Sequence, residues 1–494
     1  MQRRREFLKL VGKLGTVVSV SPLFITGRSW ADIASTTIND VHSQLNSTEV
    51  LAIKKPSTIQ QLSRILSETT ASGEQVSLCG SRHSMGGQQF GSRTVLIDVC
   101  SLNRVIGLDR EQKVVHVEAG ITWPKLIDWL NEHAPELSII QKQTGADEMT
   151  LAGALSSNIH GRGLISRPII EDVESFTIVT ASGEELECSR QRNAGLFGLA
   201  IGGYGLFGVI TTVGLRLTDR ITVERVVTTR PVADLVPAIE ARIADGYLFG
   251  DLQYMTDESA EGFMRMGVFS CYKPAAADAF PSTQRQMLNL EQWQKLYLLA
   301  HVDKGEAFKN YRDYYLQTDG QIYWSDQHQL STYLENQNVL LNEAMGHPFR
   351  SSLMISELYV PRSELGSFME NARAAALEQD MDIIYGTIRI IEKDTESFLA
   401  WAKEDYACII FNLHVIHTEE GLAKAKDDFR RLIDEALALG GSYYLTYHRW
   451  ARKDQVLAAY PQFPEFLRLK KEYDPEERFT SDWYRHYQVM FQST

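Results

Sequence analysis

Residues 79–88 read CGSRHSMGGQ, and they combine glycines, serines, an arginine and a histidine directly after a run of strand character. Glycine frees backbone N–H groups to converge on an anion, and a neighbouring arginine adds positive charge. The stretch therefore favours a phosphate-binding loop. Plain surface turns have a similar composition, so this loop alone does not name a ligand.

The segments on either side of the loop predict a β-α-β-loop-β unit followed by further strands. Ser57 is a candidate N-cap for the first helix, Gly73 ends that helix, and Thr122 can cap the second. The helix over residues 59–72 places apolar side chains on one face. The predicted strands are residues 50–53, 75–78, 94–98, 114–119, 173–180 and 210–217, and the predicted helices are residues 59–72 and 123–133.

A second unusual stretch, TGADEMTLAGALSSNIHGRG, covers residues 144–163 and is dominated by small residues. Small side chains let a backbone approach a planar ligand closely, which is the interpretation favoured here. A turn packed tightly against a helix is the alternative.

Residues 203–208 read GYGLFG and match the dinucleotide pattern GxGxxG. That fingerprint must follow a strand and open a helix. Here residues 209–213, VITTV, have strand character instead. The match is therefore interpreted as a coincidence, and a Rossmann site is not expected.

Length and composition predict a soluble protein of two or three domains. The chain has 494 residues, of which 44% are hydrophobic and 23% charged, with a formal net charge of −13. Such an acidic chain is a poor binder of nucleic acid or anionic membrane, so small molecules are the expected partners. The cysteines, widely spaced and odd in number, suggest neither a disulfide framework nor a metal cluster; they are Cys79, Cys100, Cys188, Cys271 and Cys408.

The first 31 residues predict a targeting segment. The sequence RRREFLKL precedes a short apolar run that ends near Ser29-Trp30-Ala31, a small-x-small cleavage pattern. The run contains Lys13 and Pro22, so export by the twin-arginine route is favoured over a membrane anchor. The expected location is the periplasm or outside the cell, and the remaining chain is still more acidic.

Three motifs in order carry a family resemblance: GSRHSMGGQ, TLAGALSSNIHGRG and GGYGLFGVIT. They resemble the flavin-binding motifs of the vanillyl-alcohol oxidase and p-cresol methylhydroxylase (PCMH) superfamily. The middle motif is most similar to those of sugar-alcohol oxidases and aldonolactone oxidoreductases, and residues 443–461 resemble the closing segment of decaprenylphosphoryl ribose oxidase. The resemblance implies an α+β protein with a two-subdomain FAD-binding domain and a substrate domain built on an antiparallel sheet flanked by helices.

The implied domain boundaries follow from the motifs and from a change in composition. Glycine becomes sparse and aromatic residues frequent after about residue 222. The expected parts are a signal segment at 1–31, an FAD-binding PCMH-type domain at 46–222, a substrate domain at 223–440 and a C-terminal segment at 441–494 that returns to the FAD domain.

The resemblance also implies which residues hold FAD. His83 occupies the position at which several relatives carry FAD through an 8α-histidyl bond; a histidine that only hydrogen-bonds within the loop is the alternative. The implied cofactor-binding residues are Gly80, Ser81, Arg82, His83, Ser84, Met85, Gly87, Gln88, Thr144, Gly145, Leu151, Gly153, Ala154, Ser157, Asn158, His160, Gly161, Gly208 and Ile210.

Strands predicted over residues 353–360, 383–391 and 405–417, with helices over 364–379 and 422–439, make up the substrate domain. Alternation places Glu357 with Tyr359 on one strand face and Thr387 with Arg389 on one face of its neighbour. His414 and His417 fall on opposite faces, which makes them a poor metal pair.

Candidate catalytic groups come from the resemblance and from what alcohol oxidation requires, namely a cation to stabilise negative charge and a base. Arg389 and Arg452 are the candidate cations, and His448 or Tyr447 the candidate base. Alditol oxidases have a glutamate where this chain has Thr387, with Glu392 as the nearest carboxylate. Each of these residues also has an ordinary core or surface interpretation.

The expected function is FAD-dependent oxidation of a CH–OH group in a sugar, polyol, aldonolactone or related polar substrate. Oxygen, a cytochrome or a quinone would reoxidise the flavin. A non-catalytic flavin or substrate carrier is an alternative. A cytokinin dehydrogenase-like amine oxidoreductase is another, based on the shared HSxxGQ pattern.

Overall fold

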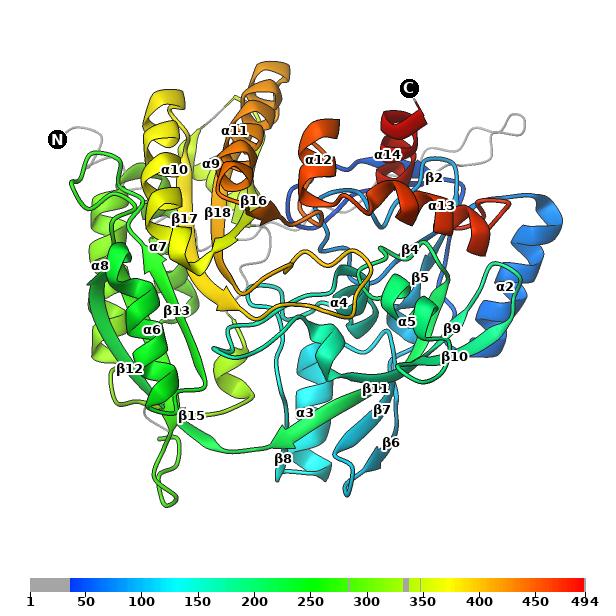
Figure 1. Cartoon of the computed structure of the whole chain (residues 1–494), viewed down its shortest axis with the longest axis horizontal. Helices are drawn as coiled ribbons and strands as arrows, with labels where there is room; N and C mark the ends of the chain where they lie inside the picture. Colours follow the sequence, from blue (N-terminus) through cyan, green and yellow to red (C-terminus); the bar gives the residue numbers. More distant parts are fainter. Residues whose placement is uncertain (1–35, 283–284, 332–336, 347, 493–494) are drawn as a thin grey trace, which may run out of the picture.

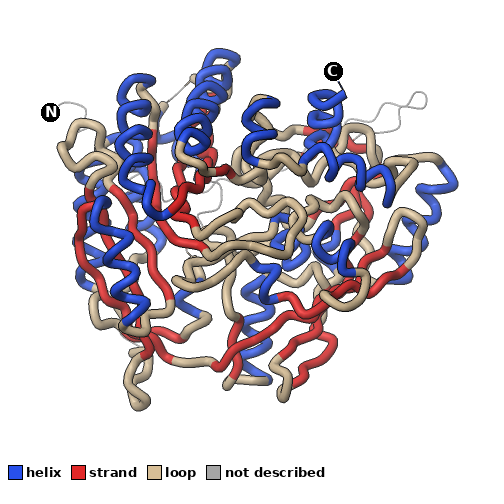
Figure 2. Tube along the Cα trace, in the orientation of Figure 1, coloured by secondary structure: helices blue, strands red, loops and turns tan. Residues whose placement is uncertain are grey.

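The computed structural model describes residues 36–282, 285–331, 337–346 and 348–492. The predicted signal segment, residues 1–31, therefore lies outside the described residues. Figure 1 shows two halves: strands from the first part of the chain on one side, and a large sheet from the middle of the chain on the other. Loops fill much of the junction between them (Figure 2).

The first sheet is parallel and contains β3 (Ala52–Lys54), β5 (Val95–Asp98) and β4 (Val76–Cys79) in that order. Helix α2 (Ile59–Ser72) connects β3 to β4 and buries its apolar face, as its periodicity predicts. Thr58, not Ser57, caps the helix: its Oγ1 accepts from the Gln61 N–H at 3.1 Å. Strands β1 (Thr36–Ile38) and β2 (Thr48–Val50) pair separately.

The second sheet has the strand order β10-β9-β11-β7-β6, with β8 pairing to β11. Thr122 precedes α3 as predicted but makes no side-chain cap hydrogen bond. These strands and the neighbouring helices are β6 (Val105–Asp109), β7 (Val114–Glu118), α3 (Trp123–His133), β8 (Leu137–Ile139), α4 (Leu151–Ser157), β9 (Val173–Val179), β10 (Glu185–Ser189), α5 (Ala194–Ala200) and β11 (Val209–Asp219).

The order of elements around residues 203–208 confirms that GYGLFG is not a dinucleotide fingerprint. Helix α5 precedes this segment and strand β11 follows it, the reverse of the order that the fingerprint requires. Gly208 has φ +145°, and a Cβ there would lie 2.5 Å from the Val179 carbonyl oxygen. The glycine thus allows a tight entry into β11.

The third sheet is antiparallel, and among the described residues its order is β15-β12-β14-β13-β17-β18-β16-β19. Its strands are β12 (Thr222–Pro231), β13 (Phe249–Tyr254), β14 (Met266–Pro274), β15 (Ile322–Trp324), β16 (Ser351–Pro361), β17 (Ile383–Ile391), β18 (Tyr406–Ile416) and β19 (Ser442–Tyr443). The associated helices are α6 (Leu235–Ala244), α7 (Leu290–Val302), α8 (Lys304–Gln317), α9 (Gln337–Met345), α10 (Leu365–Gln379) and α11 (Glu419–Ala438). The predicted α+β class, with a helix-flanked antiparallel sheet, is confirmed.

The register of this sheet gathers polar residues on one face. Gln253 on β13 is opposite Thr387 on β17, and Arg389 on β17 is opposite Cys408 on β18. Ile410 on β18 is opposite Glu357 on β16. Directly paired residues point to the same side of a sheet. These residues from four strands therefore share one face. The sequence alternation predicts this for Thr387 and Arg389 within β17 and gives the face of Glu357 within β16.

After β19 the chain crosses back to the first sheet through α12 (Lys453–Ala459), α13 (Phe463–Tyr473) and α14 (Asp482–Gln492). The Val76 N–H donates to the Arg478 carbonyl at 2.7 Å, and the Thr480 N–H donates to the Val76 carbonyl at 2.9 Å. The C-terminal segment is thus hydrogen-bonded to β4. Within the described residues, no helix is long and apolar enough to cross a membrane.

Candidate active site

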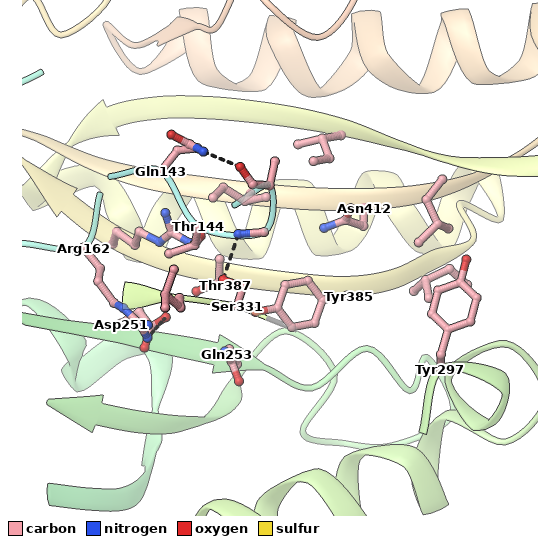
Figure 3. Close-up of a pocket in the computed structure, with 18 of the residues that line it drawn as sticks. Gln143, Thr144, Arg162, Asp251, Gln253, Tyr297, Ser331, Tyr385, Thr387 and Asn412 are labelled. Carbon is pink, nitrogen blue, oxygen red and sulfur yellow. Dashed lines mark hydrogen bonds and ion pairs between the residues drawn. The ribbon is translucent and has the colours of Figure 1, made fainter. Parts of the chain in front are cut away.

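A cavity of about 850 Å³ lies at the junction of the two halves. The polar face of the eight-stranded sheet forms one wall, and loops from the glycine-rich motifs form another. Figure 3 shows Thr387 and Asn412 from the sheet near Gln143 and Thr144 from the loops. Such a volume falls in the range of about 300–1,000 Å³ that is typical of small-molecule sites.

A narrower crevice of about 80 Å³ adjoins this cavity and is enclosed by all three sequence motifs. Its walls include Gly80, Ser81, Gly153 and Gly208. A Cβ on Gly80 would lie 2.1 Å from Thr150 Oγ1, so glycine is required there. The buried Ser81 Oγ makes no hydrogen bond in the described structure. A close backbone approach and an unpartnered hydroxyl donor fit the diphosphate of a dinucleotide cofactor.

The structure brings most of the predicted cofactor residues to these two spaces. Those that line the crevice are Gly80, Ser81, Arg82, His83, Ser84, Gln88, Gly153, Ser157, Gly208 and Ile210. Those that line the large cavity include Met85, Thr144, Gly145 and His160. Leu151, Ala154, Asn158, Gly161 and Gly87 line neither. Leu151 and Ala154 belong to the hydrophobic core, and the Asn158 amide donates to Asp394 Oδ2 at 2.9 Å.

His83 lies where the crevice meets the cavity and contacts a second histidine. Its Nδ1 is 2.9 Å from His42 Nε2, so one of the two rings donates to the other. Burial, together with the neighbouring His42 and Arg82, lowers the pKa of His83 to about 3. Burial also lowers the pKa of His42 to about 4. Both rings are therefore neutral near pH 7, and a neutral imidazole nitrogen can act as a nucleophile.

Glu357 on β16 is the centre of a buried hydrogen-bond network. Its Oε1 accepts from His160 Nε2 at 2.5 Å, from the Cys408 thiol at 2.9 Å and from the Tyr359 hydroxyl at 3.0 Å. Its Oε2 accepts from the Tyr447 hydroxyl at 3.0 Å. His160, Glu357 and Tyr447 also line the cavity. One carboxylate thus joins the middle glycine-rich motif to the sheet and to the C-terminal segment.

The electrostatics keep Glu357 ionised and its partners protonated. Burial raises the pKa of this carboxyl, but the charge and hydrogen bond of His160 and the hydrogen bond from Cys408 outweigh burial and lower the pKa to about 2. Burial and the adjacent carboxylate raise the pKa of Cys408 and of Tyr447 well above their ordinary values. Cys408 and Tyr447 therefore act as hydrogen-bond donors near neutral pH.

His160, Glu357 and Cys408 place three potential metal ligands within 4.8 Å of one another. Ligands of a tetrahedral zinc ion at 2.0–2.3 Å would be about 3.3–3.8 Å apart. The His160 Nε2 to Glu357 Oε1 distance of 2.5 Å and the Cys408 Sγ to Oε1 distance of 2.9 Å are too short for that arrangement. The geometry is that of direct hydrogen bonds.

Arg389 supplies a buried cation on the cavity wall. It donates through Nη2 to Thr144 Oγ1 at 2.5 Å and through Nη1 to the Gly161 carbonyl at 3.4 Å, while its Nε makes no hydrogen bond. Among the described residues no carboxylate forms an ion pair with it, although Glu357 is near enough for its pKa to be lowered by Arg389. Arg389 thus lines the cavity with an unused N–H donor, and its role in stabilising negative charge stays a prediction.

Three predicted catalytic residues do not line the cavity. His448 is buried among Phe429, Tyr443 and Trp450, with its ring 4.3 Å from that of Phe429. Arg452 precedes α12 and forms ion pairs with Asp434 at 2.8 Å and Asp454 at 3.0 Å.

Glu392 follows β17 and accepts from Arg362 Nη2 at 2.7 Å. Of the candidate catalytic residues, the structure brings Arg389 and Tyr447 to the cavity.

Glu357 and Cys408 were not among the predicted site residues. The alternation of β16 predicts the face of Glu357, but nothing local distinguishes it from an ordinary strand glutamate. Its partner His160 is 197 positions away in sequence. One signal could have found Glu357. The chain has Thr387 where alditol oxidases have a glutamate, so a glutamate on a neighbouring buried strand is a candidate to supply the missing carboxylate.

The crevice and the adjoining polar cavity, in an α+β fold, fit a protein that holds a dinucleotide cofactor without a Rossmann fingerprint at residues 203–208. Residues 50–189 match the family described as FAD binding domain. The chain therefore contains an FAD-binding domain of the PCMH type, and its distant relatives are aldonolactone oxidoreductases and cytokinin dehydrogenases.

Three relatives illustrate this similarity. L-galactono-1,4-lactone dehydrogenase 1, mitochondrial, of Oryza sativa subsp. japonica is 34% identical over 129 residues, which is 26% of this chain and 22% of the relative. L-gulonolactone oxidase of Bos taurus is 25% identical over 205 residues, 42% of this chain and 46% of the relative. Cytokinin dehydrogenase 2 of Arabidopsis thaliana is 32% identical over 160 residues, 32% of this chain and 31% of the relative. The chain thus spans less than half the length of these relatives.

Proposed function

We propose that this protein is an FAD-dependent oxidoreductase that oxidises a CH–OH group of a sugar, polyol, aldonolactone or similar polar substrate. The observation that carries the proposal is the buried Glu357 network facing the same cavity as Arg389, next to the crevice that fits FAD. Bound FAD would supply the hydride acceptor for the carbinol carbon. The similarity to two aldonolactone-oxidising enzymes supports the same class of donor.

The hydroxyl proton of the substrate requires an acceptor, and Tyr447 with Glu357 provides a path. The phenol stays protonated, so it works as a relay: its oxygen takes the substrate proton while its own proton passes to Glu357 Oε2. His160 Nε2 donates to Glu357 Oε1 at 2.5 Å and so holds the carboxylate that receives the proton. His160 Nδ1 lies 3.1 Å from the Gly161 carbonyl oxygen, which can only accept and so favours a proton on that nitrogen.

The proposal also includes a covalent bond between FAD and His83 and export of the folded protein. His83 would carry FAD through an 8α-histidyl bond, which its neutral ring and its position between crevice and cavity support. Export by the twin-arginine route to the periplasm would deliver the protein already folded with its cofactor. Oxygen, a cytochrome or a quinone would then accept the electrons.

Anaerobic mixing of the purified holoprotein with a panel of sugars, polyols, aldonolactones and N6-substituted adenines tests the proposed reaction. At least one CH–OH compound should bleach the visible flavin absorption and yield a product two hydrogens lighter. A flavin that stays oxidised with every compound that binds would indicate a carrier. Bleaching by an adenine and by no CH–OH compound would indicate an amine oxidoreductase.

Acid precipitation of the same protein tests the bond to His83. The flavin colour should remain with the precipitated polypeptide and pass into the supernatant for His83→Ala. Colour released from the wild type would exclude the covalent bond and leave the proposed reaction untouched. The matched control is His116→Ala, a histidine on the exposed side of β7, which should keep the colour with the polypeptide.

A further inference from the structure

The cavity extends well beyond the Glu357 network, towards the outer strands of the eight-stranded sheet. Its wall continues from Thr387 to Gln253 and Asp251 on β13 and ends at Arg225 on β12. Figure 3 shows Arg162 beside Asp251 in this region. The proposed oxidation does not account for the residues at this distal end.

Arg162 enters the distal end from the last residues of the middle glycine-rich motif. Its Nη2 donates to the His328 carbonyl at 2.5 Å, and its Nη1 is 4.0 Å from Asp251 Oδ2. Its Nε is buried and makes no hydrogen bond in the described structure. A buried guanidinium with an unused donor and only one distant carboxylate partner can accept a further anionic group.

Arg225 contributes a second buried cation, held by neutral groups. Its Nε and Nη2 donate to the Tyr272 hydroxyl at 2.9 and 2.5 Å, and its Nη1 donates to Thr318 Oγ1 at 2.9 Å. Among the described residues no carboxylate forms an ion pair with it, and the rings around it are those of tyrosines. A guanidinium has five N–H donors, so two of them remain after these contacts.

His328 carries two unpartnered ring nitrogens into the same space. The residue is 4% exposed, and neither Nδ1 nor Nε2 has a hydrogen-bond partner among the described residues. The ring packs 4.4 Å from Phe249 and 4.5 Å from Tyr272. Burial first, then the nearby Arg162 and Arg225, lower its pKa well below the ordinary value, so the ring is neutral. It therefore offers one N–H donor and one acceptor.

The charge of the cavity is opposite to that of the chain. The protein has a formal net charge of −13. The described lining nevertheless contains the carboxylates of Asp251 and Glu357 only, and Glu357 is already paired with His160. The lining arginines are Arg162, Arg225, Arg285 and Arg389. Asp251 can offset one positive charge at the distal end, so an uncompensated positive charge remains there.

We propose that Arg162, Arg225 and His328 form an anion subsite, which takes a carboxylate or phosphate at the distal end of the substrate. This inference rests on the proposed function, because it assumes that the substrate enters this cavity. The anion would receive hydrogen bonds from the unused donors of both arginines and from the imidazole. The substrate class is thereby narrowed to sugar acids or sugar phosphates, in contrast to neutral polyols and lactones.

The strand order of the sheet indicates roughly how long such a substrate would be. Arg225 on β12 is three strands from Arg389 on β17, through β14 and β13. Neighbouring strands are about 4.8 Å apart, so the two guanidinium-bearing positions are separated by about 14 Å across the sheet. The proposed subsite therefore favours an elongated substrate, with the oxidised carbon near Glu357 and the anionic group at the far end.

Calorimetric titration of the oxidised holoprotein tests the subsite with matched neutral and anionic compounds. Sorbitol is compared with gluconate and with sorbitol 6-phosphate, and lactitol with lactobionate as a longer pair. At least one anion should bind about tenfold more tightly than its neutral partner, as expected for hydrogen bonds to charged groups. The stronger of the gluconate and sorbitol 6-phosphate responses identifies the anion as carboxylate or phosphate.

Variants separate binding from folding. Arg162→Gln should remove the preference for the anion, and the surface control Arg110→Gln should keep it. His328→Phe preserves the ring that packs on Phe249 and Tyr272 and removes the unpartnered nitrogens, so it should weaken anion binding several-fold with unchanged or raised thermal stability.

Equal affinity of the wild type for every anion and its neutral partner would overturn the subsite, as would unchanged anion binding in both variants. The titration measures binding, whereas the test of the proposed reaction measures flavin reduction. The two proposals can therefore fail independently. Anion binding that is lost in Arg162→Gln, with the flavin oxidised throughout, would support the subsite and contradict the oxidoreductase. Flavin reduction by neutral polyols and by no anionic compound would support the oxidoreductase and contradict the anion subsite.

Discussion

Glu357 illustrates what a single residue contributes and why sequence alone did not reveal it. Its four hydrogen-bond partners come from the middle motif, from its own strand, from β18 and from the C-terminal segment. Period-2 alternation correctly predicts its face, and the same reasoning finds Arg389. The long-range contacts that turn an ordinary strand glutamate into the centre of a network are set by tertiary packing.

Replacing Glu357 by glutamine tests the proton path. The isosteric amide keeps the volume but removes the charge that pairs with His160, so anaerobic flavin reduction should slow by about 10²–10⁴-fold, the range of general acid–base effects. Stopped-flow absorbance measures the rate, and the visible spectrum checks that the variant still binds flavin.

The matched control for this variant is Glu392→Gln, which removes a carboxylate that pairs with Arg362 outside the cavity. Its reduction rate should stay within about twofold of the wild type, as expected for a residue outside the site. An unchanged rate in Glu357→Gln with bound flavin would contradict the role given to Glu357.

Strand β17 illustrates the scale of a single element. Its alternation and bounds are predicted from the sequence, and Ile383–Ile391 is the observed strand. Thr387 and Arg389 face the cavity, whereas Gly386 faces the opposite side, where a Cβ would lie 1.9 Å from the Tyr254 ring. The need for glycine there comes from the neighbouring strand β13 and has no local sequence signal.

Gly386→Ala should destabilise the protein by about 1–3 kcal/mol, because the added methyl group overpacks against Tyr254. Gly366→Ala is the control: Gly366 lies on an exposed face of α10 with open space around its Cβ position, and alanine there should be neutral or stabilising by about 0.5–1 kcal/mol. Urea unfolding measures both. Equal stability of the two variants would contradict the packing described for β17.

At the scale of the whole molecule, the three motifs in order predict the FAD-binding architecture, and the helix-flanked antiparallel sheet follows from periodicity. The packing of the C-terminal segment was less predictable. Its resemblance to relatives led to Arg452 and His448 as catalytic groups. Instead α12 directs Arg452 towards Asp434 on α11, and His448 joins a cluster of aromatic rings. A shift of one residue in the sequence register of this C-terminal segment changes which of its side chains reach the cavity.

Buried neutral histidines should make the whole protein sensitive to mild acid. Burial lowers the pKa of His448 to about 3 and of His301 to about 4, whereas an unfolded chain binds these protons near pH 6.5. The unfolded state therefore gains protons that the folded state does not bind. The stability that these two histidines contribute should be constant above about pH 7 and fall as the pH drops towards 4.

His448→Phe isolates one of these contributions. Between pH 7.5 and pH 5, protonation of His448 in the unfolded state should lower the free energy of unfolding of the wild type by about 2 kcal/mol. The variant should lack this contribution. Urea unfolding at both pH values measures the difference. The same pH dependence in wild type and variant would contradict the buried neutral state of His448.

The rate of anaerobic flavin reduction by a carbinol-deuterated substrate tests the proposed hydride transfer most directly. The compound is the CH–OH substrate of the panel that reduces the flavin fastest, compared with its protium form at saturating concentration. Cleavage of the carbinol C–H bond predicts a several-fold slower bleaching with deuterium in the wild type. Bleaching at equal rates with both isotopic forms, or no bleaching by any CH–OH compound, would contradict it.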